Sequence, residues 1–136
     1  MRFTITEHTF GLAVKFQIGG DLHSAAKACE SWTKAAPENL ETLDDAAGWA
    51  LTHQNRSFVW LMEWPESEGV VGTLVHELVH VAHGFLTKHI GENTDRAEET
   101  LCHLVQHLYR SALRKLKKYE QRKIVEGSHN DEPRNP

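Results

Sequence analysis

The stretch from Val70 to His89, VVGTLVHELVHVAHGFLTKH, decides how the rest of the chain is organised. Its apolar residues recur at helical spacing and Gly91 follows it, so we predict one long, largely buried helix. Within it, HELVH at residues 76–80 places two histidines one turn apart on one face. Such a pair can bind one Zn²⁺, and the glutamate between them can take a proton from metal-bound water. We therefore predict a metal site with His76 and His80 as ligands and Glu77 as the catalytic base.

A zinc site of this kind needs a third protein ligand. His83 lies roughly 10 Å from His76 along the helix axis, and the spacing to His89 does not match the extended zincin pattern. A turn followed by an antiparallel second helix would instead bring Glu98 or Glu99 back beside the histidine pair. The spacing alone leaves both glutamates open.

With these residues, the chain resembles the gluzincin branch of the zincin metallopeptidases. Residues 76–108, HELVHVAHGFLTKHIGENTDRAEETLCHLVQHL, are more particularly similar to small H-E-x-x-H proteins of tailed phages and prophages, over roughly residues 57–109. The resemblance implies Zn²⁺ as cofactor, Glu99 as third ligand, and hydrolysis of a peptide or protein substrate by metal-activated water. It also implies a phage or prophage origin, hence the bacterial host cytoplasm. His103 and His107 depart from the pattern, which more often has aromatic residues there.

His103 lies four residues after Glu99, on the same face of the second helix. We consider two roles: a candidate catalytic residue that binds a ligand or stabilises an oxyanion, and a half-buried histidine packed between helices. Trp60 and Trp64 are expected to pack in the core, with lining of a substrate cleft as the alternative.

The order of patterns predicts an α+β fold: a small N-terminal β-sheet with one helix, then the H-E-x-x-H helix and a long C-terminal helix. Residues 1–125 are expected to form a single zincin-like domain, and residues 126–136 a disordered polar tail. The expected elements are strands within residues 2–17 (3–6 and 12–16), a helix over 22–36 capped by Asp21, a hairpin of 48–53 and 57–64, and a second long helix over 95–124 capped by Thr94.

Length and composition agree with one domain. The chain has 136 residues, of which 40% are hydrophobic and 25% charged. Its longest apolar runs fall far short of about 20 residues and its first residues do not resemble a secretory signal, so we expect no membrane span and a cytoplasmic location. Cys29 and Cys102 are expected to be reduced, buried thiols.

Charge is distributed unevenly along the chain. Residues 1–109 hold 7 basic and 15 acidic side chains, whereas residues 110–125 hold 7 basic and 1 acidic. We expect this basic segment to be the solvated end of a helix, separable from the zinc site after Leu116. The alternatives are a surface for nucleic acid or for an acidic partner protein. A second functional hypothesis also stays open: a catalytically silent zincin-fold binding or regulatory protein with a structural zinc.

Overall fold

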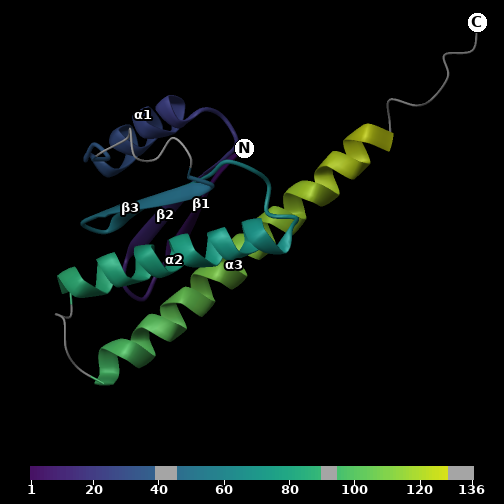
Figure 1. Ribbon diagram of the computed structural model, residues 1–136. Helices are drawn as coiled ribbons and strands as arrows, with labels where there is room; N and C mark the ends of the chain where they lie inside the picture. Colours follow the sequence, from purple (N-terminus) through teal and green to yellow (C-terminus); the bar gives the residue numbers. More distant parts are fainter. Residues whose placement is uncertain (39–45, 90–94, 129–136) are drawn as a thin grey trace, which may run out of the picture.

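A computed structural model describes residues 1–38, 46–89 and 95–128. It contains a four-stranded sheet in the order β1-β2-β4-β3, with β2 and β4 parallel and the other neighbouring pairs antiparallel. The α+β class is confirmed, with the sheet and one helix preceding two further helices (Figure 1). The elements are β1 (Arg2–Glu7), β2 (Leu12–Ile18), α1 (Leu22–Thr33), β3 (Gly48–His53), β4 (Arg56–Leu61), α2 (Glu68–His89) and α3 (Asp95–Ser128).

The sheet is covered on both faces. Along β4, Phe58 and Trp60 pack with α1, whereas Val59 and Leu61 pack with α2 and α3. Side chains along a strand alternate between the two faces of the sheet. Because both faces are buried here, this central strand is apolar throughout. Figure 1 shows the resulting three layers, with α1 on one side of the sheet and α2 and α3 on the other.

Helix α2 is the central helix of the larger core. One face of it is buried against the sheet and α3, through Leu74, Leu78, Val81 and Phe85. By length and composition alone α2 is long and apolar enough to cross a membrane. Its apolar face is used inside the domain, as expected of a core helix.

The boundaries of the first helix follow from its caps. Asp21 is the predicted N-cap, and its carboxylate accepts a hydrogen bond from Ser24 N at 2.8 Å. The helix ends at Thr33 rather than Ala36, because Lys34 adopts a left-handed conformation with φ of 64° and donates its N–H to Glu30 O.

Helix α3 is longer than predicted and packs further along its length. It runs to Ser128, so it enters the segment expected to be a tail, while residues 129–136 and the expected cap Thr94 lie outside the described residues. Packing continues past Leu116, because Trp64 lies against Tyr119 with ring centroids 5.4 Å apart and donates to Glu120 Oε1 at 3.0 Å. The buried core itself ends at Leu116, and the contact with Trp64 adds half-buried packing about one turn further along α3.

The two cysteines differ. Cys29 is buried on α1 as predicted, and burial raises the pKa of its thiol to about 11, against a smaller lowering by its contact with Thr33. Cys102 is free and exposed, so its predicted burial is wrong. The buried stripe of α3 follows Leu104 and Leu108, and Cys102 lies to one side of it.

Candidate metal centre

His76 and His80 come together on consecutive turns of α2. Their Nε2 atoms are 3.0 Å apart, and their rings meet edge to face with centroids 4.6 Å apart. Both side chains are exposed, on the face of α2 opposite its buried stripe. Two imidazole nitrogens bound to one tetrahedral Zn²⁺ would be about 3.3 Å apart. The pair therefore fits two of the positions around a zinc ion.

Glu77 is buried beside this pair. Only 6% of its surface is exposed, although the histidines on either side of it face solvent. Burial raises the pKa of Glu77, while the charge of His76 opposes that shift. No hydrogen bond to the Glu77 carboxylate comes from the described residues. The carboxylate oxygens are not among the fully enclosed polar atoms that lack a partner, and Glu77 lines a hollow beside β3. Burial of most of the side chain still disfavours the charged form.

A shallow hollow of about 470 Å³ connects Glu77 to the outer edge of the sheet. Strand β3 is an edge strand, and β3 and α2 form the two sides of the hollow. The lining of the hollow includes Glu77, His80, His83 and Lys88 from α2, and Gly48, Ala50 and Thr52 from β3.

The backbone of β3 faces outward at alternate residues. Met62 N donates to Ala47 O at 2.9 Å, which fixes the alternation along this antiparallel pair. Gly48, Ala50 and Thr52 therefore direct their N–H and C=O groups away from β4. Lys88 Nζ donates to Thr52 O at 3.2 Å, which closes one end of this edge.

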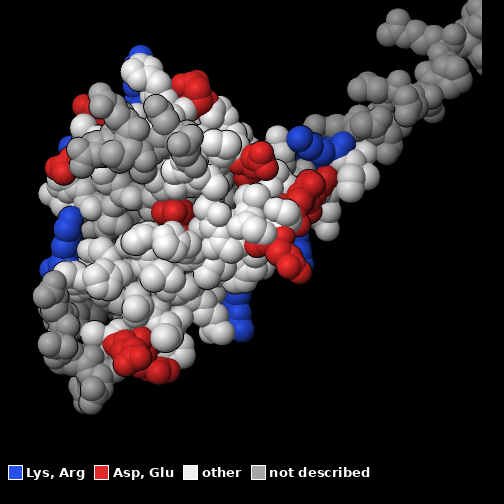
Figure 2. All heavy atoms as spheres, viewed as in Figure 1, with Lys and Arg blue, Asp and Glu red and all other residues white. Residues whose placement is uncertain are grey.

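Glu99 and His103 are not part of this cluster. Glu99 Oε1 lies 3.0 Å from His103 Nε2 on α3, and the two side chains are 75% and 72% exposed. His103 is thus neither half-buried between helices nor beside Glu77. Figure 2 shows acidic side chains exposed at the start of α3, and few charged groups over α2. Among residues 1–38, 46–89 and 95–128, no group of three or more His, Cys, Asp or Glu side chains is close enough to hold a metal ion.

The direction of the two histidines explains why Glu99 does not lie beside them. His76 and His80 are exposed on the face of α2 opposite its buried stripe, and that buried stripe is the face that packs with α3. Glu99 is exposed on α3, so it is not on the side of α2 that carries the histidines. Glu98 is also exposed, and the choice between the two glutamates stays a prediction.

Three features of the hollow do not follow from the motif. His83 lines the hollow together with His80. The spacing of three residues between them was a signal in the sequence that both lie on the same face of the helix. The edge position of β3 and the contact from Lys88 depend on tertiary structure, which local patterns do not specify.

Trp60 is buried at 2% exposure and Trp64 contacts α3, so both tryptophans serve packing.

Comparisons of the chain with family models, curated proteins and solved structures find no match. The chemistry of this site must therefore be argued from its own residues. His76, His80 and Glu77 fit a zinc centre, and the third ligand is not in place.

Proposed function

We propose that this chain is a zinc-dependent metallopeptidase. One observation carries the proposal: two histidine nitrogens lie 3.0 Å apart on α2, and the glutamate between them is 6% exposed and lines the neighbouring hollow. A histidine pair alone could be an accidental surface feature. A buried glutamate beside the pair lowers the stability of the fold. A role as a general base in proton transfer would explain why a glutamate occupies this position.

In this proposal His76 and His80 hold the zinc, with Glu99 as the proposed third ligand and Glu98 as its alternative. Zinc, when bound, lowers the pKa of a coordinated water and polarises a carbonyl group. Glu77 accepts the proton of the attacking water on its carboxylate. Burial suits this role because it raises the pKa of Glu77 toward neutral pH. A carboxylate with such a pKa can take up a proton in one step and release it in the next.

The outer edge of β3 provides a place for the substrate backbone. The outward N–H and C=O groups of Gly48 and Ala50 can pair with an extended peptide lying along the hollow. Because the hollow is shallow and Lys88 closes its Thr52 end, we propose a short or narrowly defined peptide segment as substrate.

The second candidate is a binding or regulatory protein in which the site is catalytically silent. The placement of Glu99 favours it, because Glu99 lies beside His103 on α3 and not beside His76 and His80. In either case we propose a phage or prophage origin and a location in the host cytoplasm, which rest on the resemblance of the H-E-x-x-H segment alone.

Metal analysis and peptide hydrolysis test the proposal together. Untagged protein dialysed against Zn²⁺ is expected to retain one zinc per chain by elemental analysis, and His76→Ala or His80→Ala to lose it. His23→Ala, an exposed histidine on α1, is the control and should keep it. Glu99→Ala should weaken binding more than Glu98→Ala, and the reverse result would move the third ligand to Glu98.

Hydrolysis separates the two candidates. Glu77→Gln should keep its zinc, and cleavage of a fluorogenic peptide library should fall by about 10²–10⁴-fold. Zinc-loaded parent protein that cleaves nothing in the library would favour the silent binding protein. Stoichiometric zinc in His76→Ala and His80→Ala would refute the proposed metal centre itself.

A further inference from the structure

The opposite edge of the sheet, β1, is also open. The Met1 amino group donates to Ile18 O at 2.7 Å and Ile18 N donates to Met1 O at 2.9 Å, so this is a hydrogen-bonded pair. Such pairs alternate with non-hydrogen-bonded pairs along an antiparallel ladder. Arg2, Thr4 and Thr6 therefore direct their backbone N–H and C=O groups outward, away from β2. In the part of the chain that the structure describes, no strand lies beyond this edge.

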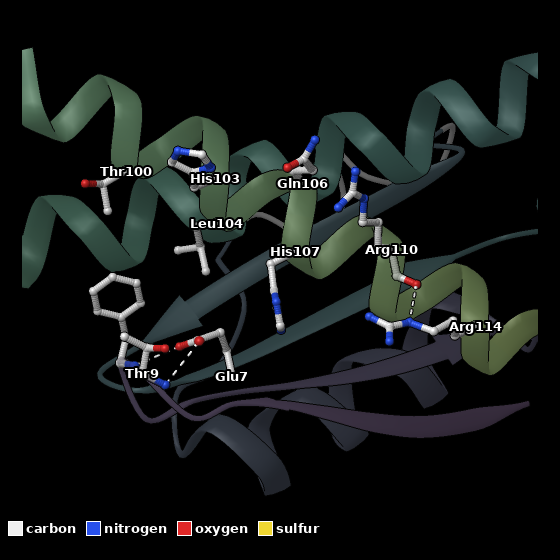
Figure 3. A pocket seen from close by; sticks show the side chains of 10 residues that line it. Glu7, Thr9, Thr100, His103, Leu104, Gln106, His107, Arg110 and Arg114 are labelled. Atoms are coloured by element: carbon white, nitrogen blue, oxygen red, sulfur yellow. Dashed lines mark hydrogen bonds between the residues drawn. The ribbon is translucent and has the colours of Figure 1, made fainter.

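A groove runs between this edge and α3. It consists of two adjoining hollows of about 590 Å³ and 510 Å³, which share His107 and Arg114. The first lies along β1 from Thr4 to Thr6, and the second lies at the turn that follows β1 (Figure 3). We call these two hollows together the β1 groove.

The β1 groove is lined by positive charge from one helix. Four cations of α3 line it: Arg110, Arg114, Lys115 and Lys118. All four are exposed, and they lie on a chain whose net charge is −4. Local charge of this sign attracts acidic groups even when the whole molecule is acidic.

Among the described residues, Glu7 is the one acidic side chain that lines the β1 groove, and it already has hydrogen-bond donors. Glu7 is 7% exposed and accepts hydrogen bonds from Thr9 N at 3.1 Å and Phe10 N at 2.7 Å, within its own turn. Burial acts to raise the pKa of Glu7, but these bonds outweigh it, so the pKa is lowered. Figure 3 shows His107 extending from α3 toward this turn, and its charge also favours ionised Glu7. Glu7 therefore stabilises the turn, and its single negative charge is outnumbered by the four cations of α3 that line the groove.

Edge strands usually carry features that prevent pairing with another chain, such as proline, a bulge or a central lysine. The middle of β1, Phe3-Thr4-Ile5-Thr6, has none of these. The cations of α3 beside it would repel basic strands and attract acidic ones. The open backbone provides main-chain hydrogen bonds, and the flanking charges provide selectivity.

We propose that the β1 groove binds an acidic, extended segment of a partner protein, which adds to the sheet beside β1. The outward groups of Thr4 and Thr6 pair with its backbone, and its acidic side chains face Arg114 and Lys118. The proposal is independent of the metallopeptidase proposal, because β1 and β3 are opposite edges of the sheet. A strand edge favours a polypeptide over a nucleic acid, which has no backbone amides to pair with it.

A short labelled peptide of alternating threonine and glutamate tests the proposal by fluorescence anisotropy with the full chain. We expect it to bind, and the same peptide with lysine in place of glutamate not to bind. Arg114→Glu should weaken binding by about tenfold, as expected for loss and reversal of a charge pair. Arg122→Glu, an exposed arginine of α3 outside the groove, is the matched control and should change it little.

Removing backbone N–H donors distinguishes binding by strand addition from binding by charge attraction alone. Thr4→Pro deletes an outward N–H while sparing the ladder to β2, so it should weaken binding by about tenfold. If this variant does not fold, a peptide N-methylated at alternate residues gives the same test with the parent protein. Unchanged binding of the N-methylated peptide, or equal competition by an oligothymidylate, would overturn the proposal in favour of a general polyanion surface.

Discussion

The Nε2 atoms of His76 and His80 lie 3.0 Å apart on consecutive turns of α2, close to the roughly 3.3 Å spacing of two nitrogens on tetrahedral zinc. The helix sets this distance, because residues four apart stack on one face. Leu74, Leu78 and Val81 fix the same helix in the core. Two ligands are thus held in place by packing that does not depend on a metal, which lowers the ordering cost of binding one.

Zinc should stabilise the folded chain measurably. At a free Zn²⁺ concentration about 100-fold above Kd, binding to the folded state alone adds about 2.7 kcal/mol. For a domain of this size, that corresponds to a rise in Tm of about 10 °C. Differential scanning fluorimetry with and without a chelator measures it. Calcium, which prefers oxygen ligands, should give no comparable rise, and an equal rise in His76→Ala would show that zinc binds elsewhere.

Metal-free Glu77→Gln should be more stable than the parent protein at neutral pH. Burial raises the pKa of Glu77 in the folded state, so the folded chain holds this proton more tightly than the unfolded chain. The stabilisation from the protonated form is complete below the unfolded pKa and is lost as pH rises through the folded pKa. Near pH 7 the ionised group is therefore a cost, which the variant removes, on the order of 1 kcal/mol.

Urea unfolding in the presence of a chelator tests this sign. The gain from Glu77→Gln should shrink as pH falls toward about 4, where the parent carboxyl is protonated as well. Glu63→Gln, at an exposed position, is the control and should show no such trend. A variant less stable than the parent at pH 7 would mean that the carboxylate has a stabilising partner.

Gly48 should not tolerate a side chain. A Cβ placed there would lie 2.9 Å from Leu61 Cδ2, Thr73 Cγ2 and the Trp60 carbonyl oxygen. We expect Gly48→Ala to destabilise the fold by about 1–3 kcal/mol in urea unfolding, because the strand and α2 must separate to admit it. Gly72→Ala is the matched control on the exposed side of α2, with no atom within 4 Å of its Cβ. It should stabilise the protein by about 0.5–1 kcal/mol, and equal effects of both changes would contradict the close contact.

The fold could be predicted largely because its signals are local. Asp21 before an apolar helical pattern, the alternating strand around Val14 and the continuous apolar run around Val59 are set by residues next to one another in sequence. Their periods gave the right elements and the α+β class. Boundaries were less accurate where a backbone conformation decided them, as with the left-handed Lys34.

The candidate site was predicted only in part, for a physical reason. His76, Glu77 and His80 lie on one helix, so spacing fixes their arrangement. Glu99 is on another helix, and its position depends on where α2 ends and how α3 returns, which no local pattern specifies. The edge strand beside Glu77 is likewise a property of strand order, which only the assembled sheet defines.

Truncation of α3 should show that its role in the fold extends beyond Leu116. Trp64 precedes α2 and lies against Tyr119 at 5.4 Å, and its indole N–H donates to Glu120. An aromatic pair is worth about 0.5–1.5 kcal/mol beyond the area it buries. We therefore expect truncation after Leu116, or Tyr119→Ala in the full chain, to destabilise the protein by about 1–3 kcal/mol.

Truncation after Lys123 should leave stability nearly unchanged, because it keeps Tyr119 and Glu120. Val125→Ala, at a position 64% exposed, is the point-mutation control for Tyr119→Ala. Zinc content should stay the same in all of these variants. His76 and His80 are on α2, whereas Trp64 precedes the first residue of α2 and contributes no side chain to the histidine pair. Equal stability of the chains ending at Leu116 and Lys123 would show that the Trp64–Tyr119 contact contributes nothing to the folded state. Loss of zinc on truncation after Leu116, with the fold retained, would instead couple this end of α3 to the metal centre.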